Sequence, residues 1–185
     1  MKTGTLMRIV AVVLASLVAS MASAQALNSG AQPIALTATL GESLTVALSA
    51  SAVNFTLTAG SATNAGSTGI TATTAWTLKP TRTAVVVDAY FASAAAALTD
   101  GVGDNIPSSA FYIADNAGTS TALVNTVAFG GANAGLQLAN VTITAANRTG
   151  TRTDAMAFNI NLTGVPQLPA ATYTGTLNIQ AQATP

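Results

Sequence analysis

Cysteine and histidine are both missing from this chain, and the two absences limit the chemistry it can perform. Without cysteine there is no disulfide and no lipid-modified cysteine to anchor a lipoprotein, although a chain of this length can bury enough apolar surface to fold without disulfides. Without histidine, the commonest general base and the commonest metal ligand are gone. The composition therefore favours a protein that works through its surface over an enzyme.

Charge is also scarce, at 6% of the residues against about 25% in an ordinary soluble protein. After residue 24 there are four basic and six acidic residues, with no basic cluster to hold nucleic acid or anionic lipid. Arg148 and Arg152, beside the turn at Gly150, are interpreted as solvated hairpin charges. A surface built mainly from Thr, Ser, Asn and Gln tolerates close self-association; a mildly soluble exported domain is the alternative interpretation.

The beginning of the chain has the three parts of a secretory signal peptide. Lys2 and Arg8 precede the apolar run 9–18, which is followed by the small-residue site Ala22-Ser23-Ala24. The run is shorter than the roughly 20 residues that a membrane-spanning helix needs, and no basic flank follows it, which argues against an N-terminal anchor. We expect residues 1–24 to be removed. The product is then secreted, in the periplasm, on the cell surface or outside the cell, with no stable membrane span.

Alternation of apolar and polar residues along the rest of the chain predicts β-strands. It is clearest at residues 156–162, where every second side chain is large and apolar. Further alternating segments lie near residues 36–40, 44–48, 53–57, 70–78, 85–89, 111–113, 127–129, 136–138, 141–145 and 173–181. Turn-forming Gly, Asn and Pro separate them. Only residues 91–98, with four consecutive alanines, suggest a short helical crossover.

These segments predict an all-β fold, an Ig-like antiparallel β-sandwich of roughly seven to ten strands after the cleaved signal peptide. A closed barrel is the alternative architecture. Residues 25–33 read as a flexible lead-in, and residues 34–185 as one sandwich domain.

No set of residues predicts catalysis, and we expect no enzyme activity and no cofactor; a small hydrolase is the least favoured function. The polar loop 99–105 contains Asp100, Asp104 and Asn105, whose oxygens and glycine turns are of the kind that calcium prefers. The loop lacks the acidic residues and closing Glu of an EF-hand. A solvated turn is therefore the preferred interpretation, and no metal site is predicted.

Four aromatic residues are candidates for a platform that binds sugars: Trp76, Tyr90, Tyr112 and Tyr173. Trp76 is in phase with the apolar face of its strand, so we expect it in the core between two sheets. Tyr90 and Tyr112 have the opposite phase from their apolar neighbours and are expected to face outward. A glycan partner is thus supported only by these two tyrosines.

The two ends of the region after the signal peptide carry a resemblance. Tyr173, Gly175, Leu177 and Ile179 follow Pro169 and small residues, an ending that resembles the final strand of bacterial secreted Ig-like and pilin-like domains. Residues 33–40 are similar to the donor segments of cysteine-free chaperone–usher pilins. The last residues, 180–185, depart from the pilin pattern, which often finishes with an aromatic residue.

The resemblance implies an exported structural or adhesive surface protein that can form a pilus or fibre by strand addition. By resemblance, Ile34, Leu36, Ala38 and Leu40 are the inserted side chains, and the partner is another copy or another envelope protein. The alternative is an extracellular or envelope binding module with a glycan or protein ligand. Whether residues 25–40 pair within their own chain or with a neighbour stays open at this point, and no nucleic-acid partner is expected.

Overall fold

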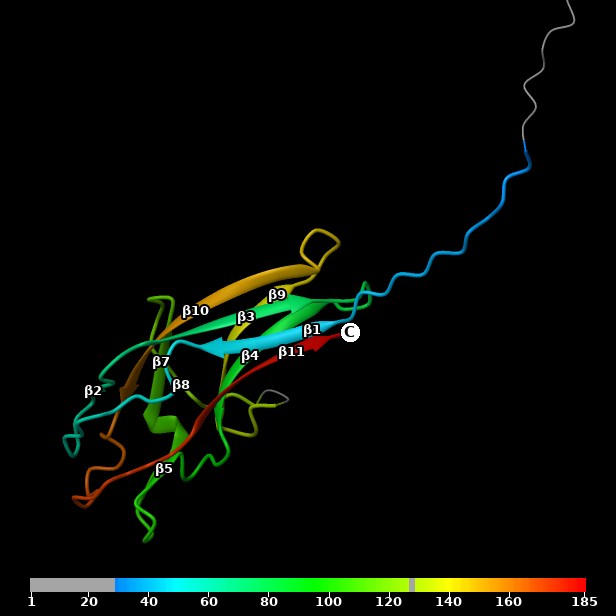
Figure 1. Cartoon of the computed structure of the whole chain (residues 1–185). Coiled ribbons are helices and arrows are strands. Elements are labelled where there is room, and N and C mark those ends of the chain that lie inside the picture. The colour runs from blue at the N-terminus through cyan, green and yellow to red at the C-terminus, as the bar shows by residue number, and fades with distance from the viewer. Residues whose placement is uncertain (1–28, 127–128) are drawn as a thin grey trace, which may run out of the picture. The chain divides into compact units, whose positions relative to one another are not determined.

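A computed structural model of the chain describes residues 29–126 and 129–185 (Figure 1). The chain divides into two units, residues 1–39 and residues 40–185. The expected signal peptide lies outside the described residues. The strand expected near residues 36–40 is not formed: these residues have no secondary structure, and the first strand of the described residues begins at Ser43. An extended segment becomes a strand only when a neighbouring strand pairs with its backbone.

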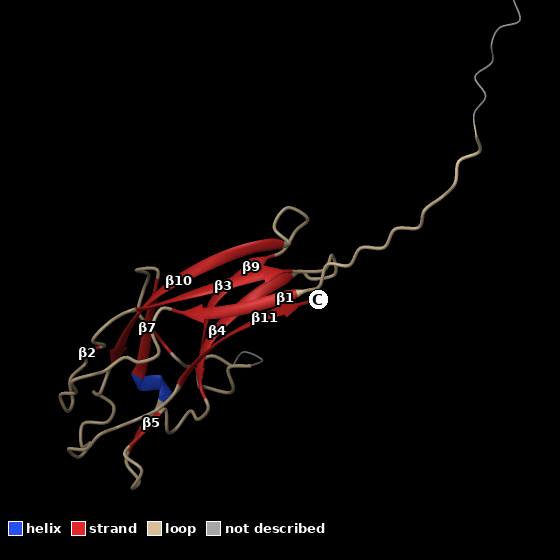
Figure 2. Ribbon diagram, viewed as in Figure 1, coloured by secondary structure: helices blue, strands red, loops and turns tan. Residues whose placement is uncertain are grey.

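Residues 40–185 form an antiparallel β-sandwich, which confirms the predicted fold class (Figure 2). The larger sheet has the order β1-β3-β10-β7-β8, with β2 also paired to β10. Its strands are β1 (Ser43–Leu48), β2 (Asn64–Ala65), β3 (Ile70–Thr77), β7 (Phe111–Asp115), β8 (Thr121–Ala122) and β10 (Thr149–Ile160). The second sheet has the order β11-β4-β9, built from β4 (Ala84–Phe91), β9 (Gly135–Thr142) and β11 (Leu177–Thr184).

A separate hairpin joins β5 (Leu98–Thr99) to β6 (Asn105–Ile106), and a short 3-10 turn, η1 (Ser108–Ala110), precedes β7. Seven strands of the described residues have five or more residues, within the predicted range, and four two-residue strands add to them. All pairings between these strands are antiparallel. The two main sheets stay open, so the barrel alternative is wrong.

The core lies between the sheets, where the predicted alternation sends every second side chain inward. In the larger of two apolar clusters, the rings of Phe91 and Phe158 both pack on Phe111, at centroid distances of 5.1 and 5.9 Å. The second cluster contains Trp76, which is 5% exposed and donates its indole N–H to the carbonyl oxygen of Asn147. The expected core position of Trp76 is therefore confirmed.

The predicted helical crossover at residues 91–98 is wrong. Phe91 ends β4, and the alanines after it bond to distant segments. The Ala97 N–H donates to Ile106 O, and the Ser108 N–H donates to Ala94 O. A single turn of helix is marginal by itself, so these tertiary hydrogen bonds decide the backbone conformation.

Three other expectations change. The segment predicted as a strand at 53–57 forms only an isolated bridge, between Phe55 and Gly66. The segments predicted at 136–138 and 141–145 are largely one strand, β9, whose pairing with β4 shifts register between Val87 and Asp88. The segment predicted at 127–129 lies partly outside the described residues.

Arg152 is not the solvated hairpin charge that the sequence suggested. It lies on the inward phase of β10, two residues from Asp154, which is fully buried. An Arg152 Nη2–Asp154 Oδ1 distance of 2.6 Å and an Arg152 Nη2–Asp115 Oδ2 distance of 3.8 Å define this ion-pair cluster. A guanidinium can lie on the inward face of a sheet in this way when carboxylates pair with it.

Candidate functional site: an open seam between β1 and β11

The strand order identifies a place in the sandwich where one strand is missing. An Ig-like sandwich of the constant type has strands A, B, E and D in one sheet and C, F and G in the other. By sequence and pairing order, β1, β3, β10 and β7 correspond to A, B, E and D, β4 to C, and β11 to F. The remaining long strand, β9, pairs with the outer edge of β4 and has no counterpart among the seven. In the described residues, no strand pairs with the other edge of β11, where G belongs.

Tyr173 supports the assignment of β11 as strand F. Its hydroxyl donates to the carbonyl oxygen of Pro169, with an O–O distance of 3.0 Å. A tyrosine near the start of strand F that bonds to backbone a few residues upstream is a hallmark of Ig-like sandwiches. This hydrogen bond explains why a tyrosine begins the Tyr-x-Gly-x-Leu-x-Ile ending: its hydroxyl fixes the turn before β11.

Gly175 holds the segment before β11 against the β5–β6 hairpin. A Cβ at this position would overlap the carbonyl oxygen of Ala97 and lie 3.0 Å from its carbonyl carbon. The neighbouring residues Thr99 and Thr174 exchange both N–H to O hydrogen bonds, each at 2.9 Å. Only glycine permits this approach, which keeps the segment 170–176 tied to β5.

A groove therefore opens along the seam between the two sheets. Its cavity of about 740 Å³ has residues 48–57 as one wall and residues 170–179 as the other. Its floor is apolar and includes the core rings of Phe91, Phe111 and Phe158. Leu177 and Ile179, the last two residues of the predicted ending motif, also line it. The motif thus forms one side of an apolar groove.

The predicted strand-addition residues lie in a described segment without secondary structure. Ile34, Leu36 and Leu40 are 82%, 90% and 86% exposed, and Ala38 is exposed as well. Three large apolar side chains on alternate positions are thus open to solvent, which is costly for a segment with no partner.

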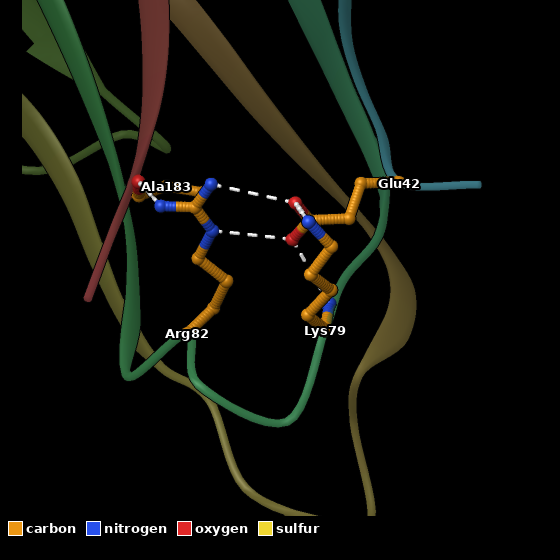
Figure 3. A network of polar contacts seen from close by, with 4 residues as sticks. All are labelled: Glu42, Lys79, Arg82 and Ala183. Carbon is orange, nitrogen blue, oxygen red and sulfur yellow. Dashed lines mark hydrogen bonds and ion pairs between the residues drawn. The ribbon is translucent and has the colours of Figure 1, made fainter.

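One end of the seam is closed by a charged cluster, which we call the clasp: Glu42, Lys79 and Arg82 (Figure 3). The Arg82 Nε–Glu42 Oε1 distance is 3.1 Å and the Lys79 Nζ–Glu42 Oε2 distance is 3.3 Å. A third bond runs from Arg82 Nη1 to the carbonyl oxygen of Ala183 in β11, at 3.3 Å. Hydrogen bonds from Arg82 and from the Lys79 backbone N–H lower the pKa of Glu42 to about 2.

Sequence reasoning did not find the clasp. Glu42 and Arg82 are 40 residues apart, and Ala183 is 101 residues from Arg82. The only available signal was that Glu42 is the first charged residue after the expected signal peptide. The pairing depends on how β1, β4 and β11 meet at one end of the sandwich.

The polar loop 99–105 is the turn of the β5–β6 hairpin. Asp100 Oδ1 accepts the backbone N–H groups of Val102, Gly103 and Asp104 at 2.9, 3.1 and 3.0 Å. These bonds, with that of Val102 first, lower the pKa of Asp100. Asn105 Nδ2 donates to Gly103 O. Because one oxygen of the carboxylate serves the loop's own backbone, Asp100 stabilises the turn.

The four aromatic candidates do not form one platform. Trp76 lies in the core, and Tyr173 lies at the turn before β11. Tyr90 is on the outer face of the β11-β4-β9 sheet, where its hydroxyl bonds to Gln180, and Tyr112 is on the outer phase of β7 in the other sheet. A sugar could not stack on these residues together.

Within residues 29–126 and 129–185, no helix is long and apolar enough to cross a membrane. Comparison with protein families, with curated proteins and with solved structures finds no match to this chain. The site therefore has to be interpreted from its own geometry.

Proposed function

We propose that this protein is an exported subunit of a self-assembling surface fibre, in which residues 34–40 of one copy fill the open seam of the next. The observation that supports this most directly is the empty seventh position of an Ig-like sandwich, at a groove with an apolar floor. The incoming segment would act as the missing strand.

The donor segment has the chemistry that the groove requires. Seven residues in extended conformation span about 23 Å and place alternate side chains on one face. That face carries Ile34, Leu36, Ala38 and Leu40, while the opposite face carries Ala35, Thr37 and Thr39. The β11 wall offers backbone, since in the described residues β11 pairs with β4 alone among the strands. The other wall, residues 48–57, includes only Leu48 of β1. Strand addition gains affinity from such main-chain bonds and specificity from the alternate side chains.

The remaining features fit a protein that acts outside the cell beside copies of itself. The predicted signal peptide would export it, and the low charge of the chain weakens repulsion between copies. A structural or adhesive role needs no cofactor and no catalytic residue.

A pair of substitutions on the two faces of the donor segment tests the proposal. In the chain from Gln25, Leu36→Asp should abolish concentration-dependent assembly, because a carboxylate cannot enter the apolar groove without a partner. Thr37→Asp, one residue further on the opposite face, should still assemble. Analytical ultracentrifugation across a range of concentrations measures both, and a chain lacking residues 25–40 should behave as Leu36→Asp does.

Equal assembly of the two variants and of the shortened chain would overturn the proposal. A wild-type chain that stays monomeric at every concentration, and does not bind a synthetic peptide of residues 30–41, would do the same. Circular dichroism of each variant checks that the sandwich is folded.

A further inference from the structure

We propose that the clasp is the end stop of the seam: Arg82 occupies the edge of β11 at Ala183 and so fixes the register of the added strand. This inference rests on the proposed function and deepens it by naming the residue that sets where the incoming strand must end. The evidence is the direction of the β11 carbonyl groups and the position of the arginine.

Along a paired strand, the backbone groups of successive residues point to opposite edges. The carbonyl oxygen of Thr184 accepts the N–H of Thr83 at 3.0 Å, so the backbone of Thr184 points toward β4. The carbonyl oxygen of Ala183 therefore points to the other edge, the edge that an added strand would use. Arg82 Nη1 already donates to that oxygen.

The same guanidinium reaches the opposite wall of the seam. Arg82 Nε and Nη2 donate to the two oxygens of Glu42, at 3.1 and 3.4 Å, and Glu42 directly precedes β1. The clasp thus spans from the start of β1 to the end of β11 (Figure 3). A second hollow of about 310 Å³ lies here, lined by Glu42 and Arg82 together with Ala181 and Ala183.

A stop is useful at this edge because the register of a repetitive segment is weakly specified. In the donor, Leu36, Ala38 and Leu40 repeat every two residues, so a slip of two residues keeps every apolar side chain facing the groove. Side-chain phase alone cannot prevent such a slip. A charged side chain on an edge backbone group can, because a strand that moved past Ala181 would have to displace it.

The absence of native cysteine allows the register to be read from single disulfides. The acceptor is the chain from Gln25 carrying Leu36→Asp, which cannot donate its own strand, with Gln180→Cys or Gln182→Cys on the exposed outer face of β11. The donor is a peptide of residues 30–41 with one cysteine in place of Ala35, Thr37 or Thr39. Mass spectrometry after mild oxidation identifies each linked pair.

With the clasp intact, Gln180→Cys should link to a donor cysteine and Gln182→Cys should link to none. Adding Arg82→Ala should raise the yield of the Gln182→Cys link at least tenfold. Lys79→Ala is the matched control, because Lys79 pairs with Glu42 and, in the described residues, makes no hydrogen bond or ion pair with β11; it should keep the wild-type pattern. Arg82→Lys keeps the positive charge but loses the planar guanidinium that bonds to Glu42 and Ala183 together, so it should give an intermediate yield. This variant replaces Arg82→Ala in the test if Arg82→Ala does not fold.

The two failures are distinguishable. Linking at Gln182→Cys with the clasp intact, or an unchanged pattern in both Arg82 variants, would overturn the end stop while leaving strand addition in place. No link to either acceptor cysteine, combined with no peptide binding, would overturn the proposed function and the end stop with it.

Discussion

Asp88 is a carboxylate that the fold buries without giving it a partner. It has 0% of its surface exposed, and neither carboxylate oxygen has a hydrogen-bond partner. Its cross-strand neighbours, Gln180 on β11 and Gln137 on β9, are neutral. Burial alone raises the pKa of Asp88 to about 6. At neutral pH the ionised Asp88 is buried without a partner, which lowers the free energy of unfolding of the sandwich.

Replacing this carboxylate should therefore stabilise the protein. We expect Asp88→Asn to raise the free energy of unfolding at pH 7 by about 1–3 kcal/mol, because the neutral amide removes a buried charge and a pKa raised to about 6 corresponds to a penalty of that size. Urea unfolding monitored by Trp76 fluorescence measures it. Asp100→Asn is the contrasting control. It replaces a carboxylate that accepts three backbone N–H groups with a neutral amide, which weakens these hydrogen bonds and should lower the free energy of unfolding.

The pH dependence of this effect has a definite sign. The folded state holds the Asp88 proton more tightly than the unfolded state, so its contribution to stability falls as pH rises from about 4 to about 6. The advantage of Asp88→Asn should thus appear in this range and be absent below it. An advantage that is constant from pH 3 to pH 7 would contradict this account of Asp88.

At the scale of elements, the segment leading into β11 forms a wall of the seam because it is bonded to the β5–β6 hairpin and not to β1. The Thr99–Thr174 bridge and the close approach at Gly175 set this position. Tyr173 adds a bond to Pro169 at the same turn. The ending motif, which in the sequence is only a pattern, thus acts as the spacer that keeps the groove open.

A methyl group at Gly175 should disturb this wall. We expect Gly175→Ala to cost about 1–3 kcal/mol, as overpacking usually does, and to reduce affinity for the donor peptide, because the segment must move away from Ala97. Gly164→Ala is the matched control, since nothing lies within 4 Å of a Cβ there. Urea unfolding and a peptide-binding titration measure the two effects, and equal behaviour of the two variants would argue against the spacer role.

At the scale of the whole molecule, the sandwich of residues 40–185 has a groove that reaches its core. Phe91, Phe111 and Phe158 pack against one another, yet the cavity of about 740 Å³ reaches them. Filling it with apolar side chains removes that surface from water, which favours the filled state. Under the proposed strand addition, filling the groove would therefore also stabilise the fold.

The proposed strand addition predicts that the donor peptide stabilises the acceptor. Added to the Leu36→Asp chain at 100 times its dissociation constant, the peptide of residues 30–41 should stabilise it by about 2.7 kcal/mol. Thermal unfolding at several peptide concentrations measures the shift. A peptide that carries Leu36→Asp itself is the control and should leave the midpoint unchanged; a shift of the same size with that peptide would contradict insertion into the groove.

The sequence by itself determined the local features of this protein. Alternation in residues 70–78 and 156–162 predicted strands and their inward faces, and it placed Trp76 in the core, because a side-chain period of two is a property of the extended backbone. The same reasoning failed at residues 91–98, where hydrogen bonds from Ala97 and Ser108 overrode alanine's helix propensity.

Tertiary structure alone decided which edges meet. Segments that are far apart in the chain meet at the seam between β1 and β11 and at the contact of Arg82 with Ala183. Asp88 is likewise buried where β4 pairs with the distant strand β11. A local sequence pattern does not predict which strand will pair with which. The burial of a side chain depends in turn on which segments the paired strands cover. The sequence thus supplied the apolar face of residues 34–40, and the fold supplied the groove proposed to receive it.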